Sequence, residues 1–177
     1  MRIRERSKEV LVIDDPIIKV ERADLSILAE RLPESKKGRV RLCAHPDVSD
    51  LLHEMLILLD KDTYVRPHRH LNKVESFHII EGEVDVVIFD ENGAVKELVQ
   101  MGEYHSGKKF YYRLSQALYH TVLIRSETVL YHETTNGPFN KSDTLYAPWA
   151  PAEEGGQVEP FLKELHSKVS GYLHNAS

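Results

Sequence analysis

From residue 84 onward the sequence consists of short apolar runs separated by polar joints, and this regularity constrains the fold more than any other feature. The runs cover 84–90, 94–101, 109–114, 120–125 and 128–134. They are rich in β-branched or aromatic residues, and Glu91-Asn92-Gly93 between the first two is typical of a β-hairpin turn. Several short strands at this spacing predict an all-β domain, either a sandwich or a barrel.

The rest of the chain predicts elements on both sides of this region. A buried strand is expected at 53–59, extended runs at 9–22 and from residue 39, a short helix at 23–31 and an amphipathic helix at 158–173. The run APWAP around Trp149 is expected to pack on the barrel as an ordered lid or dimer element. We therefore expect one domain with three parts, namely an N-terminal extension at 1–38, a barrel at 39–136, and a C-terminal lid loop and helix at 137–177.

Composition narrows the class of protein. Of the 177 residues, 41% are hydrophobic, which is enough for a packed core, and the net charge of −5 argues against a nucleic-acid-binding role. No run of eighteen apolar residues and no apolar N-terminal leader is present, so we expect neither a membrane span nor a signal peptide. Cys43 is the single cysteine, which predicts a buried structural thiol in a protein of the reducing cytoplasm.

The stretch PHRHLNKVESFHIIEG, residues 67–82, interrupts the strand pattern with histidines and a carboxylate. In an extended segment His68 and His70 share one face, and the loop after them can bring Glu75 over both imidazoles. Such groups are costly to bury without a partner, and a metal ion would bind all three. His120 is the best placed fourth ligand. Three imidazoles and a carboxylate suit one divalent transition metal ion (Zn, Fe, Mn, Ni or Co) better than Ca or Cu(I).

Three further residues are candidates for catalysis around this ion. Tyr64 and Arg66 share the parity of His68 and His70 if 64–70 is one strand, so both should line the same cavity. Arg66 could then clamp a carboxylate or phosphate, or it could pair with an internal acid such as Glu133. Tyr112 could donate a proton or simply form part of the cavity wall.

The spacing of His68, His70, Glu75 and Gly82, H-x-H-x4-E-x6-G, resembles the first motif of the cupin superfamily. The segment 115–120 resembles the second motif, with Ser for Pro, Ala for Gly and His120 as the ligand. This resemblance implies a cupin double-stranded β-helix, that is, a jelly-roll barrel, with the N-terminal extension and the C-terminal loop and helix added to it.

Over about residues 39–155 the chain also resembles the WbuC-type cupin-fold metalloproteins. The resemblance rests on YVRPHRH, Lys73 ahead of Glu75, the ENG hairpin, GPF, APWAP, and RVRLCAHP with His45. It implies a homodimer and a link to bacterial surface-polysaccharide (O-antigen type) gene sets, and it makes His45 and Lys73 candidates for residues near the metal.

Two functional classes remain open at this point. The protein is expected to be either a metal-dependent enzyme, an isomerase or an iron-dependent dioxygenase, or a non-catalytic cupin that senses a sugar or a metal. The expected ligand is a small molecule, sugar-like or anionic, such as a sugar or nucleotide-sugar derivative. An open coordination position with a perturbed base nearby would distinguish the enzyme from the sensor.

Overall fold

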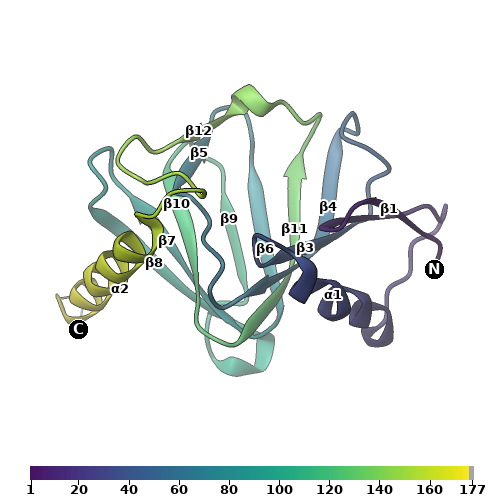
Figure 1. The fold of residues 1–177 in the computed structure, drawn as a ribbon, viewed down its shortest axis with the longest axis horizontal. Helices are drawn as coiled ribbons and strands as arrows, with labels where there is room; N and C mark the ends of the chain where they lie inside the picture. The colour runs from purple at the N-terminus through teal and green to yellow at the C-terminus, as the bar shows by residue number, and fades with distance from the viewer. Residues whose placement is uncertain (176–177) are drawn as a thin grey trace.

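The computed structural model describes residues 1–175 and contains two β-sheets that enclose a common interior (Figure 1). The seven-stranded sheet has the order β1 (Ile3–Ser7), β2 (Val10–Ile13), β3 (Arg39–Cys43), β4 (Leu52–Asp60), β11 (Thr128–Asn136), β6 (Glu75–Glu81) and β9 (Tyr111–Leu114). The five-stranded sheet has the order β12 (Thr144–Tyr146), β5 (His68–His70), β10 (Tyr119–Ile124), β7 (Glu83–Phe89) and β8 (Val95–Gly102). Neighbouring strands run antiparallel, except for the parallel pair of β2 and β3.

Strands that are distant in the sequence lie side by side in both sheets. β11 lies between β4 and β6, and β10 lies between β5 and β7, because the chain winds back and forth between the sheets. This is the arrangement of a jelly roll closed into a barrel. The expected all-β cupin barrel, with an N-terminal extension and a C-terminal loop and helix, is confirmed.

The turn between β6 and β7 depends on a glycine. Gly82 has a φ of +86°, and a Cβ atom there would lie 2.4 Å from the backbone oxygen of Thr128. Only glycine has both the conformational freedom and the small size for this position. Its place in the sequence motif therefore reflects the close approach of β11 to this turn.

Alternate side chains of both sheets point inward and form the main core. This core includes Ile57, Ile79, Val86, Val122 and Val129, and all five are buried. The alternation follows from the period of two along a strand. Because this core is built from apolar side chains of both sheets, we expect the barrel to fold without a metal ion.

The two helices cover opposite outer sides of the barrel (Figure 1). α1 (Ser26–Arg31) buries Leu28 against the outer face of the seven-stranded sheet, and α2 (Val158–Asn175) buries Leu165 and Val169 against the five-stranded sheet. Short 3-10 helices are found at Arg22–Leu25, Leu32–Glu34, Tyr104–Ser106 and Lys141–Asp143. No helix in the described part of the chain is long and apolar enough to cross a bilayer.

The terminal segments are joined to the sheets. β1 and β2, from the segment expected as an extension, lengthen the seven-stranded sheet, and β12 lengthens the other one. Trp149 packs on Phe89, with 5.0 Å between ring centroids, and on Gly93, where a Cβ atom would lie 2.9 Å from the indole ring. The boundaries 1–38, 39–136 and 137–177 stay a prediction, and residues 176–177 lie outside the described residues.

Candidate metal centre

Four side chains that the sequence singles out converge at one point inside the barrel. His68 and His70 come from β5, His120 from β10, and one ring nitrogen of each lies within 4.8 Å of the others. Glu75 lies between two of them, with Oε1 2.8 Å from Nε2 of His120 and Oε2 3.3 Å from Nε2 of His70. The arrangement offers three nitrogen atoms and a carboxylate to a single small volume.

Strand pairing brings these residues together. His68 on β5 is the register partner of His120 on β10, and β12 lies on the other side of β5 with Thr144 opposite His70. Glu75 begins β6 in the opposite sheet, where its register partner is Thr135. The loop between β5 and β6 therefore crosses from one sheet to the other and carries the carboxylate toward the imidazoles.

Each imidazole is oriented through its second nitrogen. Nδ1 of His68 lies 2.8 Å from the backbone oxygen of Arg66, and Nδ1 of His120 lies 2.9 Å from that of Leu118. Nδ1 of His70 lies 3.1 Å from the hydroxyl of Thr144. A carbonyl oxygen accepts the Nδ1 proton, so the lone pair of each of these two rings is on Nε2. This is the usual arrangement of metal-binding histidines.

Two buried atoms of the cluster lack hydrogen bonds. Oε1 of Glu75 and Nε2 of His120 are 2.8 Å apart, yet neither has a partner with acceptable hydrogen-bond geometry among the described residues. A buried polar atom without a partner costs free energy. Two polar atoms that lie this close without a hydrogen bond between them can both bind a metal ion placed between them. The residues present therefore fit a bound metal ion.

The protonation states also favour metal binding. Burial lowers the pKa of His68 to about 4, so this ring is neutral at physiological pH. Burial opposes ionisation of Glu75, but the His120 and His70 imidazoles outweigh it and hold the pKa of the carboxyl below its usual range. Burial likewise lowers the pKa of His120, and Glu75 reverses this and raises it. A metal ion would therefore compete with a proton on His120.

The cluster lies on the wall of a cavity of about 480 Å³ between the sheets. Charged residues on this wall outside the cluster are Arg6, Arg39, Arg41, Asp47, Lys73 and Glu133. Burial, followed by the nearby charge of Glu75, raises the pKa of Glu133 to about 7, while Arg41 and Lys73 oppose the shift. The cavity thus holds a second carboxyl group that changes its ionisation near neutral pH.

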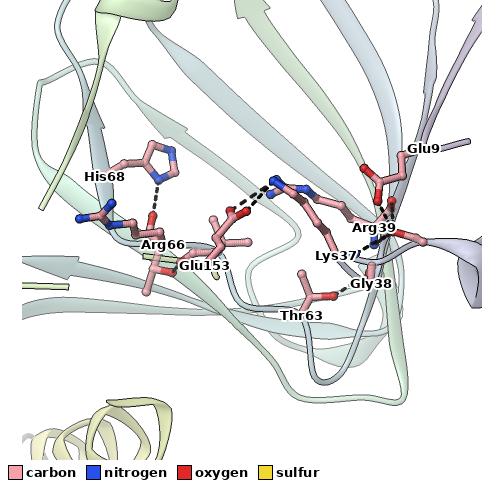
Figure 2. A network of polar contacts seen from close by, with 11 residues as sticks. Glu9, Lys37, Gly38, Arg39, Thr63, Arg66, His68 and Glu153 are labelled. Carbon is pink, nitrogen blue, oxygen red and sulfur yellow. Dashed lines mark hydrogen bonds and ion pairs between the residues drawn. The ribbon is translucent and has the colours of Figure 1, made fainter. Parts of the chain in front are cut away.

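Tyr64 and Arg66 do not line this cavity. The expected strand over 64–70 is wrong, because β5 begins only at His68, and Pro67 lies directly before it. The hydroxyl of Tyr64 donates to the backbone oxygen of Pro151 at 2.9 Å, and the Arg66 guanidinium lies 4.9 Å from the centroid of the Tyr146 ring. In Figure 2 the side chain of Arg66 points away from the neighbouring salt bridges. Both side chains contact the C-terminal segment, and their catalytic roles stay predictions.

Tyr112 lies beside the cluster without facing the cavity. Its ring packs on Phe77, with 5.6 Å between the centroids, and its buried hydroxyl has no hydrogen-bond partner in residues 1–175. Burial raises the pKa of this hydroxyl, and the charge of Glu75 adds to the effect. Its position is that of a wall residue, one of the two alternatives expected, and a role in proton transfer stays a prediction.

Sequence reasoning did not identify Arg41 and Glu133 as site residues, although their pattern was readable. Arg39, Arg41 and Cys43 alternate on β3, and Tyr131, Glu133 and Thr135 alternate on β11; all six line the cavity. Charged residues at inward positions of a strand are the available signal. His45 and Lys73, expected only from resemblance, also line the cavity, with His45 stacked 4.2 Å from His53 and Lys73 4.8 Å from the Phe139 ring centroid.

Comparison with known proteins gives a family of undefined function and distant structures. A family model described as a domain of unknown function (DUF6016) matches residues 20–101, and no curated protein matches the chain significantly. A mutant oxalate decarboxylase from Bacillus subtilis is 21% identical, with a TM-score of 0.44, over 56% of this chain and 25% of that one. A protein from Shewanella oneidensis is 14% identical, with a TM-score of 0.47, over 58% of this chain and 66% of that one.

CapF in complex with 3-isopropenyl-tropolone is 13% identical, with a TM-score of 0.49, over 63% of this chain and 32% of that one. This chain therefore spans about a quarter of the length of the decarboxylase and about a third of CapF. At these identities no metal, substrate or assembly can be transferred from those proteins to this chain. Its own sheet order and side-chain cluster describe a cupin-fold protein with a group of residues suited to a metal ion.

Proposed function

We propose that this protein is a metal-dependent enzyme that moves a proton on a small polar molecule bound in the cavity. His68, His70, Glu75 and His120 would hold one divalent transition metal ion, which when bound would polarise a carbonyl oxygen of the ligand. The observation that supports an enzyme most directly is Glu133, a carboxyl group on the wall of the same cavity and outside the four candidate ligands.

The role proposed for Glu133 is general acid–base catalysis. Its pKa of about 7 in the metal-free protein results mainly from burial, which a bound metal ion would not remove. Efficient proton transfer needs a group whose pKa lies near the working pH, and such a group contributes roughly 10²- to 10⁴-fold to a rate. A side chain that both accepts and returns a proton within one cavity supports isomerase-type chemistry more than oxygenation.

The substrate class is part of the same proposal. The many charged and polar side chains on the cavity wall suit a polyhydroxylated molecule such as a sugar or nucleotide-sugar derivative. The resemblance to WbuC-type proteins supports a role in bacterial surface-polysaccharide (O-antigen type) biosynthesis and a homodimer. The lone buried thiol of Cys43 supports a reducing compartment such as the cytoplasm.

A non-catalytic cupin that senses a sugar or metal is the alternative function. It is supported by the oriented imidazoles, which would serve a sensor as well as an enzyme. A sensor would need the cavity and the cluster but would have no use for an acid–base group at Glu133. The two functions therefore differ in what replacement of this residue does.

Hydrogen exchange into a substrate would test the enzyme proposal. The protein, loaded in turn with each of the five candidate metals, would be incubated in D₂O with aldoses, ketoses and sugar nucleotides, and analysed by mass spectrometry. We expect deuterium at the carbon next to a carbonyl group, and Glu133→Gln should slow its incorporation by about 100-fold or more with metal content unchanged. Glu81→Gln, an exposed carboxyl at the end of β6, is the matched control.

The contrary result is equally clear. If no compound exchanges in the wild type, and Glu133→Gln binds the same ligands with unchanged affinity, the enzyme proposal is wrong. The sensing function would then be favoured, because ligand binding without proton transfer is all that it requires.

A further inference from the structure

We propose that the cavity binds a phosphorylated ligand, and that Arg41 and Arg6 hold its phosphate group at a subsite separate from the metal cluster. The inference deepens the proposed function and rests on it for the other end of the ligand, which would lie at the metal. The phosphate subsite itself rests on four features of the cavity wall, namely its position, its unpaired guanidinium groups, the placement of the nearby acids and its size.

The first feature is the position of Arg41 in the sheet. Arg41 on β3 is the register partner of Ile57 on β4, and Ile57 is the partner of Tyr131 on β11. Glu75 of the metal cluster instead aligns with Thr135, four residues away along β11. The backbone positions of Arg41 and Glu75 are therefore roughly 13 Å apart along the strand direction. They are also three strands apart across the sheet. This backbone separation places Arg41 away from the metal cluster, and an extended ligand would span the two.

The second feature is that the guanidinium groups have no partners. Neither Arg41 nor Arg6 makes a side-chain hydrogen bond or ion pair with any of residues 1–175, although both line the cavity. Burial raises the pKa of the Cys43 thiol. The positive charges of Arg41 and Arg6 both lower it, and Arg41 has the stronger effect. The two cations therefore converge on one part of the wall. Arg41 is half-buried, and a partly buried guanidinium is normally paired, whereas Arg6 is exposed.

The neighbouring cations show what a paired side chain looks like in this cavity. Arg39 lies one inward position from Arg41, and its guanidinium is 3.4 Å from the carboxylate of Glu153, which also binds Lys37 at 2.7 Å (Figure 2). Lys73 lies over the ring of Phe139. These cations are already engaged by the protein, so they leave Arg41 and Arg6 as the pair open to a ligand.

The third feature is that nearby acids do not neutralise this pair. Glu133 feels the charge of Arg41, but no ion pair within 4.0 Å joins them in the described chain. Asp47 also lies near Arg6, but its Oδ1 accepts hydrogen bonds from the backbone N–H and the hydroxyl of Ser49, at 2.7 and 2.6 Å. The space between the arginines and these acids is part of the cavity.

The chemistry of two guanidinium groups selects the ligand. Guanidinium donates parallel hydrogen bonds to phosphate or carboxylate oxygens, and two of them suit the double charge of a phosphate best. An uncharged sugar would cover the half-buried Arg41 guanidinium without compensating hydrogen bonds. The fourth feature, a volume of about 480 Å³, is within the range of small-molecule sites. The ligand class is therefore a phosphorylated small molecule with a polar end that reaches the metal.

Calorimetric titration with inorganic phosphate would test the subsite. The wild type, Arg41→Gln, Arg6→Gln and the control Arg113→Gln, an exposed arginine on β9, would each be measured with metal and after chelation. We expect phosphate to bind the metal-free wild type, each cavity substitution to weaken it about tenfold, and the control to leave it unchanged. Arg41→Lys should give an intermediate loss, because it keeps the charge but not the paired donors.

A second titration compares D-glucose 6-phosphate with D-glucose on the metal-loaded wild type, and the phosphorylated sugar should bind at least tenfold more tightly. Phosphate binding that disappears on chelation and is unaffected by Arg41→Gln would place the anion on the metal and overturn the subsite, while the metal centre would stand. Wild-type protein that holds no metal yet binds phosphate through Arg41 would support the subsite and contradict the proposed enzyme.

Discussion

The two ends of the cavity are built in opposite ways. At the metal-cluster end, His68, His70 and His120 each have an acceptor for Nδ1, so the rings are held in place before any ion arrives. At the other end, the guanidinium groups of Arg41 and Arg6 have no partner in the described chain. The first end is prearranged by the protein, whereas the second is completed only by a ligand.

This difference has an energetic meaning. Orienting a ligand side chain in advance lowers the entropy lost on metal binding, and it makes the site sensitive to every supporting contact. An unpaired guanidinium contributes no hydrogen bond or ion pair to the fold, and a bound anion would supply its hydrogen bonds. Substitutions at the metal end should therefore affect metal affinity strongly, and substitutions at the arginine end should affect ligand binding but not folding.

The largest effect is expected from His70→Ala. Loss of a contact that only orients a metal ligand lowers metal affinity by about 10- to 100-fold. Because His70→Ala removes a candidate ligand itself, metal content should fall by about 100-fold or more. Elemental analysis of the purified variant measures this directly. His78→Ala, an exposed histidine on β6, should keep full metal content, and full occupancy in His70→Ala would remove this residue from the ligand set.

Thr144→Val should have a smaller effect on the same site. The substitution keeps the shape of the side chain but removes the hydroxyl 3.1 Å from Nδ1 of His70. We expect metal affinity to fall by about tenfold, since the ring loses its orienting partner but remains a ligand. Competition with a chromogenic chelator provides the measurement. An unchanged affinity would mean that strand pairing alone orients His70.

Metal affinity should also depend on pH in a defined direction. Burial lowers the pKa of His120, but Glu75 outweighs this effect and leaves it above the usual value, so a proton competes with the metal below that pKa. Affinity should rise with pH by up to about tenfold per unit and then level off. His68, with a pKa of about 4, contributes nothing in this range. Metal titrations from about pH 5.5 to 8.5 would show the slope.

The metal-free protein should show the opposite trend in stability. A histidine with a raised pKa stabilises the fold below its unfolded pKa, and the contribution is lost as pH rises through the folded value. The raised pKa of His120 should therefore make the metal-free form less stable as pH rises above neutral. Urea unfolding at several pH values tests this, and a rise in stability over the same range would contradict it.

The smallest effect is expected from Arg41→Gln on stability. The guanidinium makes no hydrogen bond or ion pair with residues 1–175, so the free energy of unfolding should change by no more than about 0.5 kcal/mol. Urea denaturation measures it, and unchanged metal content would complete the contrast with His70→Ala. A loss of several kcal/mol would show that Arg41 supports the fold and would erase the difference between the two ends.

Much of this structure was readable from the sequence. The strands from residue 84 onward, the barrel and the convergence of His68, His70, Glu75 and His120 follow from local patterns and motif spacing. The face shared by Tyr64 and Arg66 was wrong, because parity holds only within an unbroken strand and β5 has three residues. The backbone oxygen of Arg66 instead accepts a hydrogen bond from His68.

Other features depend on contacts that no local pattern specifies. β12 becomes a strand only because β5 offers it an edge, although 73 residues separate His70 from Thr144 along the chain. The role of Glu133 depends on which charges face it from β3 and from the loop before β6. Its inward position on β11 was readable, but the burial that raises its pKa is a property of the closed barrel.

The short strand β5 has a consequence for how the protein is made. His68 and His70 are synthesised early, but their strand is bordered on one side by β10 and on the other by β12, which ends at Tyr146. Until that residue has left the ribosome, the nascent chain can present two histidines without the strands that position them. A metal ion bound during translation would therefore meet a complete site only once β10 and β12 can close around the earlier segment.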